Sequence, residues 1–345
     1  MLTKKMTVMA GLVVALCGGG AAAQSSVTLY GITDVFAGQK TTGTGASKVK
    51  RHVVDSDGLA NSRWGLRGSE DLGGGTRADF QVESLFDLST GATTQVATAP
   101  TAASTQLFSS QAWVGLSGGF GAVRLGRQVT PFHSYVGAIN NLYDATAFST
   151  TGTVWGLGNL PNYLGRFDNS ISYETPVFGG VVAKIAQGFG EDKTALVAGS
   201  KNTSLNVKYA SGPVLVGYSF QKQGAAAGLN AIKYNLVGGA YDFGVVRLVA
   251  AYNTARRDGN RDAEWQGGIS VPFGAASVAA GYGRSKGELH GASANKGVGY
   301  SLLGTYDMSK RTRLYTGLRK TTAKNAAGTT TNETSTFGMG VIHRF

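Results

Sequence analysis

The chain has 345 residues, of which 42% are hydrophobic, and its formal net charge is +12 at pH 7. A mean hydropathy of −0.04 excludes a membrane protein built from apolar helices, but it suits a sheet with one apolar and one wet face. The one cysteine, Cys17, lies in a segment that we expect to be removed. Disulfides, thiolate chemistry and cysteine-based metal sites are therefore excluded.

Residues 1–23 have the features of a secretory signal peptide. Lys4 and Lys5 give a positive start, an apolar stretch follows at 6–17, and small residues lead to an Ala-x-Ala site that ends at Ala23. The apolar stretch is too short to span a bilayer as a helix. The remaining residues, 24–345, contain no composition break, so we expect one exported domain.

Hydrophobic and polar residues alternate with a period of two in many places, for example at 205–209, 214–221 and 264–271. Seven short turns alternate with eight longer polar segments, which predicts about sixteen strands with both chain ends on the short-turn side. Aromatic residues cluster beside the short turns, as in the girdle of a membrane barrel. The pattern predicts an all-β fold: a transmembrane antiparallel β-barrel in the outer membrane of a Gram-negative bacterium, crossing it many times.

The first expected strand, at 27–36, is less regular, because both of its faces are partly apolar. Val27, Leu29 and Val35 share one face, whereas Tyr30 and Phe36 share the other. Either one side packs against another subunit, or a bulge resets the alternation.

The segment 131–167 is the longest connection, and it is apolar for an exposed loop. A barrel of about sixteen strands encloses a water-filled channel, so folding this third long loop into the lumen would bury its apolar side and narrow the passage. The apolar residues are Tyr135, Val136, Ile139, Leu142, Tyr143, Phe148, Val154, Trp155, Leu157, Leu160, Tyr163 and Leu164.

Several motifs, in order along the chain, resemble the Gram-negative general porins, most closely the betaproteobacterial trimeric porins of the anion-selective type. They are SVTLYG at 26–31, SRWGLRGSEDLG at 62–73, LGRQ at 125–128, RFDNSISY at 166–173 and the ending HRF at 343–345. The resemblance implies a homotrimer in contact with outer-membrane lipids, including lipopolysaccharide. It also implies passive diffusion of ions and small hydrophilic solutes, and an inward third loop that faces a ladder of arginines: Arg63, Arg67, Arg127 and Arg166.

Strand alternation supports part of this ladder. Arg63 and Arg67 oppose the apolar residues beside them, so they are expected in the lumen. Arg124 and Arg127 are an odd number of residues apart, so on a regular strand they point to opposite faces and cannot both lie inside. Alternation favours Arg124, whereas the resemblance favours Arg127 and requires a bulge at Gly126; we take Arg127 as the pore residue.

The third loop carries one acidic residue, Asp144, which we include in the expected constriction. A basic wall opposite a nearly acid-free loop predicts a preference for anions. Further basic residues expected in the lumen are Arg77, Lys184, Lys208, Lys233, Arg247, Arg313 and Arg319.

The sequence also bears on other functions. A channel specific for phosphate, sulfate or small organic acids would use the same arginines, and adhesion by the long loops would add to transport. No enzyme, metal or cofactor is expected, because the four histidines form no recognisable catalytic pattern and no phosphate-binding Gly-Lys-Ser/Thr motif exists. Nucleic-acid binding is not expected either, since the basic residues alternate along strands in an exported chain.

Overall fold

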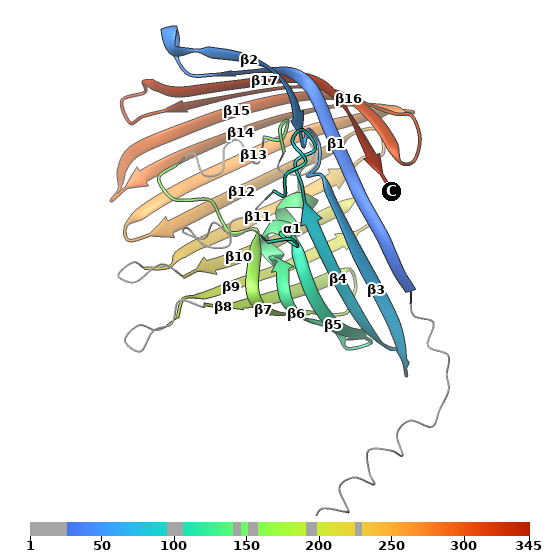
Figure 1. Cartoon of the computed structure of the whole chain (residues 1–345). Coiled ribbons are helices and arrows are strands. Elements are labelled where there is room, and N and C mark those ends of the chain that lie inside the picture. Colours follow the sequence, from blue (N-terminus) through green and yellow to red (C-terminus); the bar gives the residue numbers. More distant parts are fainter. Residues whose placement is uncertain (1–25, 95–105, 141–145, 151–157, 191–198, 225–229) are drawn as a thin grey trace, which may run out of the picture.

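The computed structural model describes residues 26–94, 106–140, 146–150, 158–190, 199–224 and 230–345. Over these residues the strands form one antiparallel sheet that rolls into a barrel (Figure 1). The elements are β1 (Ser26–Thr42), η2 (Gly45–Ser47), β2 (Val49–Ser56), β3 (Arg63–Gly73), β4 (Thr76–Leu85), β5 (Gln111–Gly118), β6 (Gly121–Val129), α1 (Pro131–Ala138), β7 (Arg166–Glu174), β8 (Val181–Phe189), β9 (Lys201–Ser211), β10 (Val214–Gln223), β11 (Ile232–Asp242), β12 (Arg247–Arg257), β13 (Asn260–Phe273), β14 (Ala276–Leu289), β15 (Ala292–Asp307), β16 (Thr312–Lys324) and β17 (Thr330–Arg344).

The barrel closes where β1 pairs with β17, the last strand. The other edge of β1 is shared by two strands: residues 35–42 pair with β2, and residues 26–32 pair with β3. β2 and β3 therefore lie end to end in one position of the wall. The seventeen strands of the described residues occupy sixteen positions, which confirms the predicted antiparallel barrel of about sixteen strands.

Short turns and long connections lie on opposite rims. β1 begins and β17 ends at the short-turn rim, where Phe345 exchanges backbone hydrogen bonds with Gly31. Exposed aromatic side chains gather at this rim, as expected for a girdle at the lipid headgroups. They are Phe120, Phe178, Tyr241, Phe243, Phe273 and Tyr306. The predicted signal peptide at 1–23 lies outside the described residues.

Most strands expose apolar side chains outward and place polar ones inside. On β13, Trp265 and Ile269 are exposed on the outer face, whereas Glu264 and Gln266 are buried on the inner face. This is the alternation that a barrel with a lipid-facing exterior requires. Among the described residues, no helix has the length and hydrophobicity needed to cross a membrane.

β11 reverses the expected alternation. Tyr234 and Leu236 are buried inside the barrel, so Lys233 lies on the outer face, and its expected place in the lumen is wrong. The inner face is apolar here because a loop covers it. The same cause explains the two apolar faces of the first strand, since Phe36 is buried inside the barrel against Phe148.

Candidate functional site

The third long loop enters the barrel through α1, which lies inside the wall (Figure 1). Thr130 caps the helix, because its Oγ1 accepts a hydrogen bond from the His133 backbone N–H at 3.2 Å, and Pro131 occupies the first turn. The apolar face of the helix packs on β9, β10 and the inner face of β11. The buried residues of this face are Phe132, Tyr135 and Val136, and Ile139, which follows the helix directly, is buried with them.

Glycines in the wall give the helix room. A Cβ at Gly217 would lie 2.9 Å from the Tyr135 ring, and one at Gly238 would lie 2.7 Å from Ile139 Cδ1. Tyr135 also donates its hydroxyl hydrogen bond to the Gly238 carbonyl. At the other end of α1, Arg247 donates from Nη2 to the Ala138 carbonyl at 3.1 Å, a favourable position for a cation beside a helix C-terminus.

A second part of the loop, residues 146–150, docks on the wall near the barrel closure. Phe148 is fully buried, with its ring centroid 5.2 Å from that of Phe36 and 6.1 Å from that of Tyr315. Gly317 leaves space for this ring, since a Cβ there would lie 2.6 Å from Phe148. The loop is therefore anchored on β1 and β16.

Beside the anchor at 146–150 lies a short segment, 57–62, which leaves the wall between β2 and β3. The Asp34 carboxylate is fully buried and accepts hydrogen bonds from the backbone N–H groups of Gly58, Leu59 and Ala60 at 3.2, 2.7 and 2.8 Å. Four donors, counting the Tyr315 hydroxyl, compensate for burying this carboxylate. The residue patterns did not predict this segment; an aspartate on the inner face of an otherwise apolar strand is the signal that marks it.

A third anchor holds the returning part of the loop. Asp262 on β13 accepts hydrogen bonds from the backbone N–H groups of Asn159 at 2.9 Å and Leu160 at 2.8 Å. Further along, Leu164 donates from its N–H to Gln223 at 2.8 Å. The loop thus contacts the inner wall at three separate places, which confirms that it folds into the lumen.

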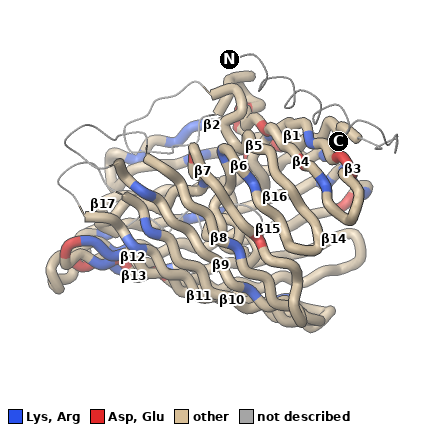
Figure 2. Tube along the Cα trace, turned by 90° about the horizontal axis from the view of Figure 1, so that it is seen from below, with Lys and Arg blue, Asp and Glu red and all other residues tan. Residues whose placement is uncertain are grey.

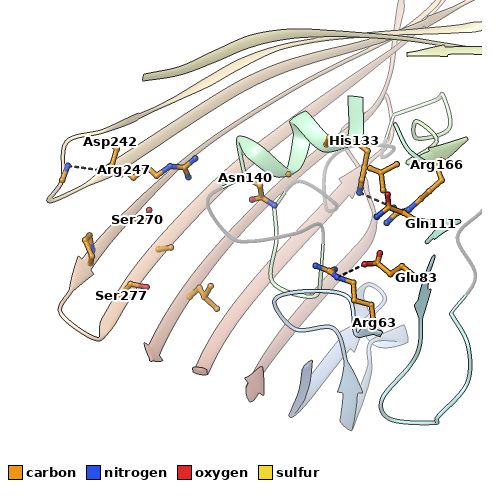
Figure 3. Close-up of a pocket in the computed structure, with 17 residues that line it drawn as sticks. Arg63, Glu83, Gln111, His133, Asn140, Arg166, Asp242, Arg247, Ser270 and Ser277 are labelled. Atoms are coloured by element: carbon orange, nitrogen blue, oxygen red, sulfur yellow. Dashed lines mark hydrogen bonds and ion pairs between the residues drawn. The ribbon is translucent and has the colours of Figure 1, made fainter. Parts of the chain in front are cut away.

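Between the loop and the opposite wall lies a cavity of about 690 Å³ (Figure 3). One side of it carries Arg63, Glu83, Gln111 and Arg166, and the loop side carries His133 and Asn140. The third side is formed by residues of β11–β15 close to the short-turn rim. Those residues are Asp242, Gly244, Arg247, Ser270, Pro272, Ser277, Ala279 and Leu303.

Hydrogen bonds fix the arginines on the cavity wall. Arg63 lies with Nε 3.7 Å from Glu83 Oε2, and its Nη1 donates to the Asn61 carbonyl at 3.3 Å. Arg166 contacts His133 Nε2 through Nη1 and donates to Ser110 Oγ through Nη2, each at 3.3 Å. Among the described lining residues, three arginines thus face two carboxylates, so the lining is net positive.

Arg67 and Arg127, two other expected site residues, occupy different positions on the inner wall. Arg67 lies on the same face of β3 as Arg63, nearer the short-turn rim, with its guanidinium 5.2 Å from the Tyr30 ring centroid. Arg127 is buried where the pairing of β6 and β7 shifts by one residue after Gly126, and it contacts Asp168 and the Ser109 carbonyl. Neither is among the described residues that line the cavity. Asp144 lies outside the described residues.

Arg124 is on the inner face, as alternation predicts. It lies 3.3 Å from Glu174 Oε2 and 5.0 Å from the Trp113 ring centroid. Lys184 Nζ approaches the same Glu174 oxygen at 3.7 Å, and both Lys184 and Lys208 line a smaller pocket beneath α1. The bulge at Gly126 that the Arg127 hypothesis requires is present, with φ of +127° at this glycine.

The described lining residues are suited to recognition of charge and shape. Within the described ranges, no three acidic, histidine or cysteine side chains are grouped so that they could hold a metal ion. The features that remain are a narrowed lumen, fixed guanidinium groups and hydrogen-bonding amides.

Comparisons with known proteins agree with this geometry. Residues 10–326 match the family described as Gram-negative porin. An outer membrane porin protein of Bordetella pertussis is 31% identical over 404 aligned positions, covering 99% of this chain and 100% of the relative. Outer membrane porin protein 32 of Delftia acidovorans is 32% identical over 332 positions, covering 92% and 89%. Among solved structures, an anion-selective porin from Comamonas acidovorans matches with a TM-score of 0.77 and 28% identity, covering 93% of this chain and all of that one.

Proposed function

Because the chain belongs to the family of Gram-negative porins, and is thus an outer-membrane channel for passive diffusion, we propose that its loop-narrowed lumen favours small anions. The observation that carries the proposal is the set of three arginines on the cavity wall: Arg63, Arg166 and Arg247. The similar Comamonas acidovorans structure is described as anion-selective, which supports the same conclusion.

The physical argument is electrostatic. Arginines stay charged at any working pH, and a narrow passage with low-dielectric walls focuses their field. Two unit charges about 4 Å apart interact by roughly 1 kcal/mol in bulk water and by more near a protein wall. The two carboxylates of the lining, Glu83 and Asp242, offset part of this field. The preference is therefore expected to be moderate, and salt should weaken it because the screening length is only about 10 Å at 0.1 M.

The test is the reversal potential of single channels under a KCl gradient. A chloride-selective sign that weakens as the salt concentration rises supports the proposal. A potassium-selective sign at low salt contradicts it. Adding phosphate, sulfate or small organic acids in the same recordings tests the alternative: saturation or block by one of them would identify a solute-specific channel.

We also propose that the protein assembles as a homotrimer through the outer face around the barrel closure. A groove of about 840 Å³ runs over β1, β2 and β14–β17 on that face, and most of its side chains are apolar. Val35, Val54, Val278, Leu314 and Met339 contribute to it. A closed symmetric assembly would bury such a face. Electrophoresis without heating should show a trimer that dissociates on heating, whereas a monomer under both conditions would contradict the proposal.

A further inference from the structure

His133 and Arg166 meet on the cavity wall, where the third loop faces β7 (Figure 3). His133 lies in the first turn of α1, and its Nε2 is 3.3 Å from Arg166 Nη1. A guanidinium has only N–H donors, so the imidazole nitrogen must accept this hydrogen bond. The His133 ring is therefore neutral in this arrangement, and its proton is on Nδ1.

The other nitrogen of the ring agrees with this tautomer. His133 Nδ1 lies 3.2 Å from the Tyr163 hydroxyl oxygen, which is placed to accept the Nδ1–H. Gly165 lies against the same edge of the ring, since a Cβ there would be 3.3 Å from Nδ1. The imidazole is thus held between a guanidinium and a phenol, with a hydrogen bond on each nitrogen.

Basic residues are spread over many strands of the barrel (Figure 2), but the charges that act on this ring are those of the cavity wall. Arg166 is in direct contact, and Arg63 of β3 and Glu83 of β4 lie on the same side of the cavity. Asp242 of β11 and Arg247 of β12 lie across it. Among these described lining residues, three arginines against two carboxylates leave an excess of one positive charge, and a charge on the imidazole would double that excess.

Two features oppose a positive charge on the His133 ring at neutral pH. The Arg166 guanidinium is a like charge in direct contact, and the positive end of the α1 dipole is close to the first turn. An imidazole ordinarily titrates near pH 6.5, so the charge is expected to appear at lower pH, between about 6.5 and 5. Histidine is the residue type that this interval singles out, because carboxylates ordinarily titrate near pH 4 and guanidinium groups above pH 12.

We propose that His133 is a selectivity-determining residue whose effect on the passage follows the pH. At neutral pH it is an uncharged acceptor for Arg166. In mild acid it becomes a fourth cation of the cavity wall, and its new Nε2–H faces the N–H groups of Arg166, so the contact between the two side chains breaks. The added charge and the released guanidinium both favour an anion in the passage. This role rests on the proposed preference for anions and adds a dependence on pH that arginines alone do not give.

The test is the reversal potential of single channels in a dilute KCl gradient, recorded from pH 7.5 to pH 5. One added unit charge about 4 Å from an ion is worth roughly fivefold in preference, so the chloride-to-potassium permeability ratio of the wild type should rise by up to about fivefold. His133→Gln keeps an uncharged hydrogen-bonding side chain, so its ratio should stay constant. His343→Gln is the matched control, because it removes an exposed histidine at the short-turn rim, and it should respond as the wild type does.

The outcomes separate this role from the proposed function. A wild-type ratio that does not change with pH overturns the role of His133. An equal rise in His133→Gln overturns it too, because the response would then belong to carboxylates such as Glu83, Asp242 or Asp144. A potassium-selective sign at pH 7.5 contradicts the proposed function instead, whereas the role of His133 is judged from the change in the ratio.

A second measurement needs no variant. With ¹⁵N-labelled histidine, NMR reports the tautomers of the four histidine rings of the chain. At pH 7.5 at least one ring should carry its proton on Nδ1, and this ring should become doubly protonated over the same pH interval in which the permeability ratio changes. Four rings that all carry the proton on Nε2 at pH 7.5 would overturn the proposal.

Discussion

Gly31 and Phe345 close the barrel by exchanging both of their backbone hydrogen bonds. The Gly31 N–H donates to the Phe345 carbonyl at 3.0 Å, and the Phe345 N–H donates to the Gly31 carbonyl at 3.1 Å. The Phe345 ring covers Gly31 so closely that a Cβ on Gly31 would overlap it. The last residue of the chain is thus part of the seam between the first and the last strands.

Gly31→Ala is therefore expected to destabilise the folded barrel by about 1–3 kcal/mol, the usual cost of overpacking, because the Arg63 backbone also blocks the added methyl group. Gly267→Ala is the matched control, since its new Cβ would meet its nearest neighbour at 3.8 Å. Urea unfolding of the refolded proteins, followed by electrophoretic mobility, measures the difference. Equal midpoints for the two variants would contradict this account.

Removal of Phe345 should likewise reduce the amount of assembled protein in the outer membrane.

Arg63→Glu should shift the reversal potential toward cations, because it replaces a positive charge on the cavity wall with a second carboxylate beside Glu83. A change of this kind is worth roughly 1 kcal/mol or more at 4 Å, or about fivefold in ion preference. Lys324→Glu, at an outer loop end, should leave the selectivity unchanged. Single-channel recording at low salt measures both.

Arg127→Glu tests a second member of the expected ladder. If Arg127 acts in the passage, its reversal should shift selectivity as the Arg63 reversal does. If it mainly holds the bulge through Asp168 and Ser109, the variant should fold poorly while the channels that do form stay anion-selective. Folding yield and reversal potential of the same preparation separate the two outcomes.

Asp262→Ala should loosen the third loop, because it leaves the backbone N–H groups of Asn159 and Leu160 without their acceptor. An unsatisfied buried donor costs about 1–3 kcal/mol. The expected result is noisier single-channel current with a higher mean conductance. Asp71→Ala, at an exposed turn of the opposite rim, is the control and should leave the current trace unchanged; a quiet Asp262→Ala channel would show that this anchor is dispensable.

Phe148→Ala should release the second anchor. Removing a fully buried phenylalanine costs about 3–5 kcal/mol where the site cannot collapse. The loop would leave the pocket formed by Phe36, Tyr315 and Gly317, and the conductance should rise. Phe337→Ala removes the same side chain from the exposed outer face and should not change the conductance. Thermal unfolding of both variants shows whether the stability loss is confined to the inner site.

The alternation of side chains made most of the barrel predictable, because lipid and water impose opposite preferences on successive residues. It placed Arg63 and Arg67 on the inner face of β3, as the structure does. It failed at Lys233, where the inner neighbours Tyr234 and Leu236 are apolar because α1 covers them. A strand whose inner face is covered by a loop carries apolar residues on that face, so its local pattern cannot be told from that of a strand with the opposite face outward. Only the tertiary contact decides which residues face the lumen.

The constriction was less accessible to sequence reasoning. The apolar content of the third loop predicted that it folds inward, but not which wall residues hold it. Asp34 and Asp262 act as anchors only because segments more than twenty residues away bring backbone N–H groups to them. Alternation did place Arg247 in the lumen, but its hydrogen bond to the Ala138 carbonyl depends on the position of the α1 C-terminus. Such pairings depend on the closed barrel, and no local spacing encodes them.

The three anchors of the third loop imply an order of events during assembly. Phe148 packs against Tyr315, and Leu160 against the carboxylate of Asp262, so the loop must find strands synthesised long after it. Contacts of such high sequence separation form late, since the chain entropy of closing long loops is lost before they contribute. The lumen of the newly closed barrel is then wider than that of the finished protein, and docking of the loop is the step that narrows it. A variant that folds but never completes this step would form a large, unselective pore in the outer membrane. Stable anchors therefore preserve the permeability barrier of the cell as well as the stability of the protein.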